Sequence, residues 1–254
     1  MSQHMATPEN FNGETSSPDA QQLPTVGKSI AWLVAFAALF YGAAMLYGAY
    51  LGVTQPDLVE DDELLMEALL SPTGLMVVSL LQAVLLIPCV LFAAHFSSQH
   101  WRDTLAFRAV PLHLLGFWAL VYCGYFVVMS VMEVLVPADH GEIMTSLAGS
   151  RHLGLFLTFV VVAPVIEELV FRGYLFTAWR KTRLGLWGTV LLTSLIFSLV
   201  HAAQYSWLIL IYLFVFSIIL GLAREKTGSI WTPAILHVLN NAIAMVSLVY
   251  LGLY

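Results

Sequence analysis

Long apolar runs dominate the chain, and short polar segments separate them. About seven runs reach or approach the roughly 20 residues that a helix needs to cross a bilayer. They cover approximately Ile30–Val53, Gly74–Phe96, Leu112–Val136, Leu153–Trp179, Leu186–Ala203, Trp207–Ala223 and Ile230–Gly252. The runs are continuous, and each is longer than the about 9–11 residues of a barrel strand. Because helices satisfy their own backbone groups in lipid, the pattern predicts an all-α, polytopic transmembrane bundle of about seven (seven or eight) spans.

The polar segments divide the chain into three parts. Residues 1–27 have almost no apolar mass, which is typical of a disordered tail. Residues 28–111 hold two spans, and Leu58–Ser71 between them carries acids on one helical face and apolar residues on another. That spacing predicts an amphipathic helix at the outer interface, either as an anchor or as a lid. Residues 112–254 hold the remaining spans and the candidate chemistry, and form the predicted catalytic core.

The charges in the loops predict an orientation. The loop Thr54–Thr73 is acidic and has no Lys or Arg, whereas the next loop carries Arg102 and Arg108. Basic and acidic loops continue to alternate along the chain. Because cytoplasmic loops are enriched in Lys and Arg, we expect the N-terminus in the cytoplasm and the C-terminus outside.

The composition agrees with a protein integral to the membrane. Hydrophobic residues make up 59% of the chain and charged residues 10%, against roughly 45–50% and 25% in soluble domains. Membrane lipid must therefore cover the surface, and the compact size suits a prokaryotic cell membrane. A net charge of -6 without a basic run gives no indication of a nucleic-acid partner. The two cysteines form neither a disulfide framework nor a zinc motif.

Ionisable residues at membrane depth cost about 2.5–3.5 kcal/mol each and are functional candidates for that reason. The fourth span carries Glu167, Glu168 and Arg172. Glu168 and Arg172 are four residues apart and can form an ion pair on one helical face. Glu167 lies about 100° around the helix from Glu168 and has no counter-ion in its own helix. We therefore interpret Glu168 as structural and Glu167 as a candidate general base.

Two further spans carry polar residues at a similar depth. His201 lies in the fifth span, and His237 and Asn241 lie four residues apart in the seventh. A His and an Asn on one face can donate two hydrogen bonds, as a developing oxyanion requires. Asn240 points about 100° away and is the weaker candidate. We expect the three spans to converge at one level of the bundle.

These residues resemble a known family. The motifs are Glu167-Glu168-x-x-x-Arg172, Phe197-x-x-x-His201 and His237-x-x-x-Asn241. In order and spacing they look like the motifs of the CPBP intramembrane proteases, which include type II CAAX prenyl endopeptidases and Abi-like bacteriocin-processing and immunity proteins. The resemblance covers roughly Leu112–Gly252.

The resemblance implies a hydrolase that cuts a peptide or protein substrate inside the membrane. In that interpretation Glu167 activates a water together with His201, while His237 and Asn241 stabilise the oxyanion. Glu168 and Arg172 support the site. The resemblance leaves the substrate open between a prenylated C-terminal motif and a membrane-bound peptide or bacteriocin precursor.

The metal requirement and two other functions stay open at this point. Members of the family are often called metalloproteases, and Glu167, His201 and His237 would suit a divalent metal such as zinc. A metal-free glutamate mechanism fits the motifs equally well, because the helical His-Glu-x-x-His motif is absent. The same fold in a non-catalytic binding or immunity protein is one alternative. A proton-coupled transporter is the other.

Overall fold

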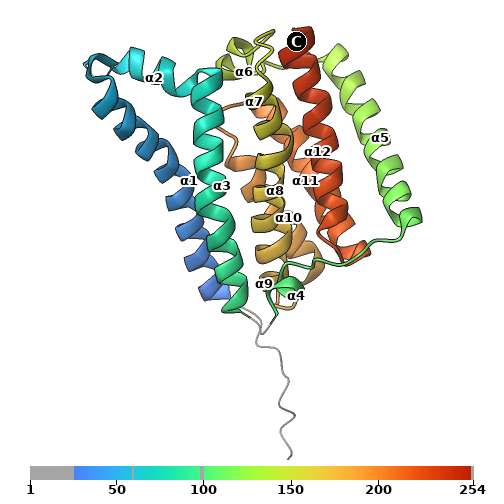
Figure 1. Cartoon of the computed structure of the whole chain (residues 1–254). Helices are drawn as coiled ribbons and strands as arrows, with labels where there is room; N and C mark the ends of the chain where they lie inside the picture. Colours follow the sequence, from blue (N-terminus) through green and yellow to red (C-terminus); the bar gives the residue numbers. More distant parts are fainter. Residues whose placement is uncertain (1–25, 59, 98–99, 253–254) are drawn as a thin grey trace, which may run out of the picture.

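The computed structural model describes residues 26–58, 60–97 and 100–252, and within these ranges the chain is built of helices without a strand (Figure 1). This confirms the all-α prediction. The first helix, α1, begins at Val26, so the last two residues of the predicted tail are helical. Residues 1–25 of that tail lie outside the described part of the chain.

Six helical segments among the described residues are long and apolar enough to cross a membrane. Single helices form four of them, namely α1 (Val26–Thr54), α3 (Pro72–His95), α5 (Leu112–Leu135) and α11 (Trp207–Thr227). The last segment joins α12 (Trp231–Met245) to the π-helix η4 (Val246–Leu251). The remaining segment is the fourth span, Leu153–Arg180, which is described below. These bounds match the predicted spans closely, because hydropathy alone determines where a chain can cross lipid.

The predicted fifth span, Leu186–Ala203, is shorter than expected. Its helix α10 (Gly185–Leu199) has 15 residues and, at 1.5 Å per residue, a length of only about 22 Å. Turns follow at residues 200–204 before α11 begins. The bundle therefore has six segments of full length and one short apolar helix among the described residues.

The fourth span alternates between two helical geometries. It runs through α7 (Leu153–Leu157), the π-helix η2 (Thr158–Val162), α8 (Ala163–Glu168), the π-helix η3 (Leu169–Leu175) and α9 (Phe176–Arg180). All seven residues of η3 are buried. Because π-helical turns are uncommon and concentrate at functional sites, they mark this span as a candidate for the functional site.

Short helices occupy the loops. They are η1 (Pro56–Leu58), α2 (Asp62–Leu70), α4 (Trp101–Thr104) and α6 (Glu142–Ser146). Asp61 caps α2 by accepting from the backbone N–H of Glu63 at 2.9 Å. Ser71 then ends α2 and caps α3. The amphipathic helix predicted within Leu58–Ser71 is thus α2, at the upper end of the bundle in Figure 1.

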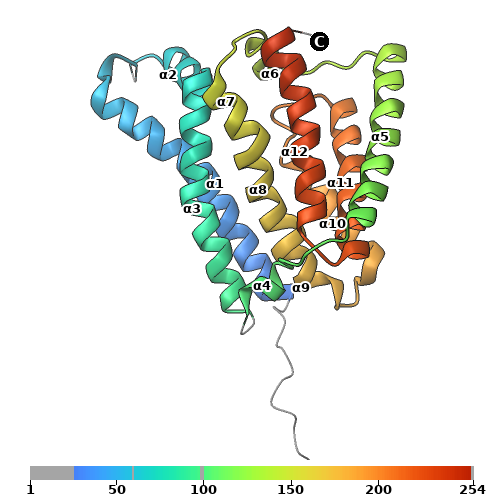
Figure 2. The same ribbon diagram turned by 45° about the vertical axis from the view of Figure 1, so that its right-hand side comes forward.

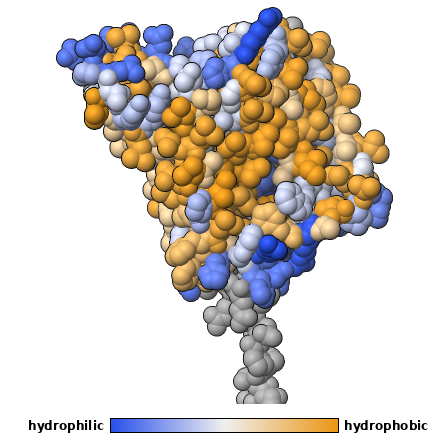
Figure 3. All heavy atoms as spheres, in the orientation of Figure 1, coloured by the Kyte–Doolittle hydropathy of each residue, from blue (hydrophilic) through white to orange (hydrophobic). Residues whose placement is uncertain are grey.

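The span α7–α9 runs through the middle of the bundle. In Figure 2, α1 and α3 lie on one side of it, α12, α11 and α10 on the other, and α5 at the outer edge. On the face shown in Figure 3, apolar side chains form a broad band, and polar side chains gather at the upper and lower ends. The first helix starts at one end of the bundle, and the last segment finishes at the opposite end (Figure 1). The chain is therefore an integral membrane protein with its candidate residues inside the bundle.

Candidate active site

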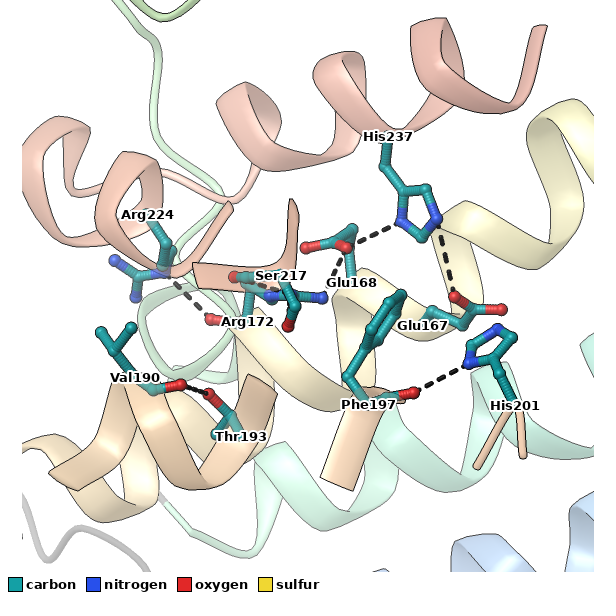
Figure 4. Close-up of polar contacts among 10 residues, drawn as sticks. All are labelled: Glu167, Glu168, Arg172, Val190, Thr193, Phe197, His201, Ser217, Arg224 and His237. Carbon is teal, nitrogen blue, oxygen red and sulfur yellow. Dashed lines mark hydrogen bonds and ion pairs between the residues drawn. The ribbon is translucent and has the colours of Figure 1, made fainter. Parts of the chain in front are cut away.

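Glu168 lies at the centre of a buried, paired network. Its side chain is fully buried, and its Oε1 accepts from Arg172 at 2.8 Å, so the ion pair predicted from the spacing is present. The same oxygen accepts from Nδ1 of His237 at 2.9 Å. Arg172 also donates to the hydroxyl of Ser217 at 2.6 Å and to its carbonyl at 3.1 Å (Figure 4). Each charge in this network therefore has an opposite charge beside it, as burial requires, although Oε2 of Glu168 and Nε of Arg172 have no hydrogen-bond partner among the described residues.

Glu167 faces a different environment. Its Oε2 lies 3.7 Å from Nε2 of His237, which is longer than a hydrogen bond. The same oxygen is buried and has no hydrogen-bond partner among the described residues. The His237 ring therefore lies between the two carboxylates and turns one nitrogen toward each (Figure 4). The sequence predicted that the two glutamates lie on different faces of the helix but did not indicate that one imidazole lies beside both.

The sequence predicted that His201 lies inside a helical span. In the structure it lies in the turn that follows α10. Its Nδ1 lies 2.8 Å from the carbonyl of Phe197. Because a carbonyl only accepts, Nδ1 carries the proton, and Nε2 of the neutral ring keeps its lone pair. The turn also lines the cavity described below, through His201 and Gln204, and irregular backbone at membrane depth is tolerated where it lines a cavity.

The ring of Phe197 connects the two halves of the site. Its centroid is 5.0 Å from that of His201 and 5.6 Å from that of His237. The guanidinium of Arg172 lies 4.8 Å from the same ring. Phe197 therefore lies between the paired network and Glu167. Its ring packs against both imidazoles, and its carbonyl accepts from His201.

A cavity of about 260 Å³ opens beside Glu167, and His201 and Asn241 also line it. Apolar residues of α1 and α3, among them Phe36 and Leu86, form much of its remaining wall. Such a mostly apolar pocket with a few convergent polar groups is the usual form of a binding or active site. The three spans that the sequence predicted to converge do meet around this space.

Asn241 is held in place from two directions. Its amide donates to the carbonyl of Phe159 at 2.9 Å, and its side-chain oxygen accepts from Asn240 at 3.3 Å. Tyr122 in turn donates to Asn240 at 3.4 Å. One N–H of Asn241 therefore stays available for a ligand. The predicted joint oxyanion site is incomplete in this arrangement, because Nε2 of His237 faces Glu167.

The predicted metal ligands Glu167, His201 and His237 do not form a metal site as they are placed. Across the described ranges, no group of three or more His, Cys, Asp or Glu residues is arranged to hold a metal ion. Nδ1 of His237 is already bound to Glu168, and that of His201 to the carbonyl of Phe197. These hydrogen bonds leave Nε2 of each ring as the possible ligand atom, as in metal-bound histidines, so the chemistry of the three side chains suits a metal although their placement does not bring them together around one.

Two residues of α11 belong to this network but escaped the sequence analysis. Ser217 holds Arg172, and Arg224 donates from Nε to the carbonyl of Arg172 at 3.0 Å. Ser217 is the one hydroxyl inside the apolar run Trp207–Ala223 apart from that of Tyr212, which was a usable signal. The predicted span ended at Ala223, but α11 continues to Thr227 and buries Arg224.

The fold and these contacts define a class: a polytopic membrane protein with a glutamate–histidine centre inside its bundle. A family profile described as "Rce1-like: Type II CAAX prenyl endopeptidase Rce1-like" matches residues 149–243. These residues include every motif residue named above. The match confirms the resemblance to the CPBP family.

Two curated relatives match about half of the chain. The "Uncharacterized 24.3 kDa protein" of Escherichia coli is 31% identical over 129 residues, which are 49% of this chain and 58% of that protein. The "Uncharacterized protein YpbD" of Bacillus subtilis (strain 168) is 30% identical over 132 residues, which are 50% of this chain and 65% of that protein. The chain thus spans less than two thirds of either relative. No solved structure matches.

Proposed function

We propose that the chain is an intramembrane endopeptidase in which Glu167 activates a water to hydrolyse a peptide bond of a membrane-associated or C-terminally processed substrate. One observation carries the proposal: Glu167 lines a cavity with His201 and Asn241 and has a carboxylate oxygen without a hydrogen-bond partner among the described residues, whereas Glu168, which also has such an oxygen, does not line the cavity. A free carboxylate beside an imidazole lone pair is suited to hold a water and take its proton. The family supports the same reaction class.

The proposed reaction follows from these positions. A water held by Glu167 and Nε2 of His201 attacks the carbonyl carbon of the scissile bond and loses one proton to Glu167. The new C–O bond moves the carbonyl electrons onto oxygen, which becomes an oxyanion. The C–N bond then breaks, and Glu167 returns the proton to the leaving amine. Positioned proton transfer of this kind typically contributes about 10²–10⁴ in rate.

The oxyanion is assigned to Asn241 and to Nε2 of His237. Asn241 lines the cavity and keeps one amide N–H available. Nδ1 of His237 donates to Glu168, so Nε2 is the nitrogen left for a substrate, and it donates to the oxyanion when the ring carries both protons.

The test is proteolysis by the purified protein in proteoliposomes. Membrane-anchored peptides with prenylated and with unmodified C-termini serve as substrates. The wild type should cleave at least one class, and Glu167→Gln should be slower by at least about 10²-fold. Glu142→Gln, which removes an exposed carboxylate on α6, is the matched control. Equal cleavage by Glu167→Gln and the wild type would refute the assigned base.

The same preparation separates the alternatives. A chelator arm measures any dependence on a divalent metal, which the proposal does not require. A transporter would show a substrate-dependent proton flux without cleavage. A binding or immunity protein would keep its function in Glu167→Gln. Either result in place of cleavage would replace the endopeptidase assignment.

We also propose that the N-terminus faces the cytoplasm of a prokaryotic cell. The end of the bundle at which α1 begins also carries α4 with Arg102, whereas the opposite end carries the acidic helix α2 (Figure 1). Positively charged loops favour the cytoplasmic side. In a Cys89→Ala, Cys123→Ala background, Glu63→Cys should react with a membrane-impermeant thiol reagent on intact cells. Arg102→Cys should react only after the cells are opened.

A further inference from the structure

We propose that Ser217 and Arg224 form a clamp on Arg172 that positions Glu168 and, through it, the His237 ring of the proposed protease site. The inference rests on the proposed function, because it assigns positioning residues to that site. Neither residue belongs to the three motifs that pointed to the site. Neither contacts Glu167 or His201 in the hydrogen bonds and ion pairs of the described residues.

The clamp follows from the geometry of α11. Ser217 and Arg224 are seven residues apart, which is close to two helical turns, so they lie on nearly the same face. That face packs on η3, where Arg172 lies. Ser217 is fully buried, and Arg224 is buried except for 9% of its surface. The clamp is therefore closed to bulk water.

Ser217 holds the side chain of Arg172. One terminal nitrogen of the guanidinium donates to Ser217 twice, through Oγ at 2.6 Å and the carbonyl at 3.1 Å. The other terminal nitrogen donates to Glu168 at 2.8 Å. Since a guanidinium is planar and rigid, fixing one nitrogen fixes the direction of the other. Ser217 therefore determines where Arg172 presents its charge to Glu168.

Arg224 holds the backbone of the same residue. Its Nε donates to the carbonyl of Arg172 at 3.0 Å, in the middle of the π-helical stretch η3. Its guanidinium also lies 5.4 Å from the ring of Phe176. The side chain and the backbone of Arg172 are thus both fastened to α11 (Figure 4).

The position of Arg172 affects the reacting groups through one atom, Oε1 of Glu168. Oε1 of Glu168 accepts from Arg172 and from Nδ1 of His237, so movement of the guanidinium moves the ring. The far nitrogen of that ring is the one that faces Glu167. Misplacement of about 1 Å at a catalytic group can lower the rate by about 10²-fold.

The test compares Ser217→Ala with Ser217→Thr and with Thr193→Val. Thr193 is a buried hydroxyl that bonds carbonyls of its own helix, so its removal controls for a lost buried hydrogen bond. We expect Ser217→Ala to lower kcat by about tenfold with KM changed less than about twofold, since the Ser217 carbonyl still holds Arg172. Ser217→Thr should restore most of kcat, and Thr193→Val should leave it unchanged. Equal losses in Ser217→Ala and Thr193→Val would overturn the clamp.

A second measurement does not depend on proteolysis. In protein labelled with ¹⁵N-histidine, with the His237 signals assigned by a His237→Gln variant, Ser217→Ala should shift the signal of Nδ1. Thr193→Val should leave it in place. Unchanged His237 signals in Ser217→Ala would overturn the clamp even if the wild type is a protease. Shifted signals without any cleavage would retain the clamp and reject the proposed function.

Discussion

Glu167 and Glu168 are adjacent in sequence, yet they lie in two very different regions of the molecule. Glu168 belongs to a buried network in which Arg172 and His237 share one of its oxygens. Glu167 lines a cavity, and its Oε2 lies 3.7 Å from a nitrogen of the His237 imidazole. The step of about 100° between successive helical residues is enough to separate them. The comparison teaches that the surroundings, and not the residue type, decide which carboxylate is free to react.

The buried network around Glu168 explains how Glu167 can stay without a hydrogen-bond partner beside the cavity. Burying an isolated charge in the membrane costs free energy, and a carboxylate beside a cavity has few contacts that offset this cost. The network of Glu168, Arg172 and Ser217 contributes contacts that join the fourth span to α11, and His237 joins it to α12. In this account one glutamate holds the helices together so that its neighbour can stay without a partner.

The largest expected effect is a loss of peptide cleavage on substitution of His201, which lines the cavity with Glu167. We predict that His201→Ala lowers the rate of peptide cleavage by about 10²–10⁴, because the water loses the partner that holds it opposite Glu167. Initial rates in proteoliposomes measure the loss. His113→Ala, which removes an exposed imidazole at the start of α5, is the control. Similar rates for the two variants would remove His201 from the proposed mechanism.

The next effect is on the paired side, at Arg172. Arg172→Met leaves Glu168 buried without its cation, and breaking a buried pair in this way costs about 3–5 kcal/mol of stability. Denaturant unfolding in detergent micelles, followed by tryptophan fluorescence, measures the change. Glu142→Gln serves again as the surface control. A stability close to that of the wild type would mean that the paired network contributes little to the fold.

Asn241 should show a smaller loss of activity. Removing one oxyanion donor costs about 10²–10³ in kcat, so we predict that range for Asn241→Ala. Asn240→Ala is the matched neighbour, and it should lose less because Asn240 only orients Asn241 through a 3.3 Å hydrogen bond. Single-turnover rates distinguish the two variants. A larger loss at Asn240 would reverse the assignment of the donor.

The smallest effect should come from outside both regions. Arg108 and Asp103 form a 3.6 Å pair, and 61% and 45% of their side chains are exposed. Asp103→Asn should therefore change the unfolding free energy by no more than about 1 kcal/mol and leave cleavage unchanged. A loss comparable to that of Arg172→Met would show that burial does not decide the value of an ion pair in this protein.

The sequence predicted the features that depend on local rules. The span bounds follow from hydropathy, and the pair of Glu168 and Arg172 follows from a spacing of four residues within a helix. The separation of Glu167 from Glu168 follows from the same helical geometry. Each of these needs no knowledge of how the helices pack against one another.

Other features depend on tertiary packing and were out of reach. The direction of the His237 ring depends on the rotation of α12 against α8, which hydropathy does not encode. The turn at His201 follows an apolar sequence, Ser198-Leu-Val-His201, that reads equally well as helix. Arg224 lies at the end of an apolar run, where a loop and a buried helical turn have the same composition.

The central claim, that two adjacent glutamates have opposite roles, is tested most directly by the thermal unfolding of Glu167→Gln and Glu168→Gln in the same detergent. This comparison needs no substrate. We predict a clearly lower Tm for Glu168→Gln, because Arg172 loses its buried counter-ion, and a Tm equal to or above that of the wild type for Glu167→Gln. Equal destabilisation by the two substitutions, or a greater loss in Glu167→Gln, would contradict the account.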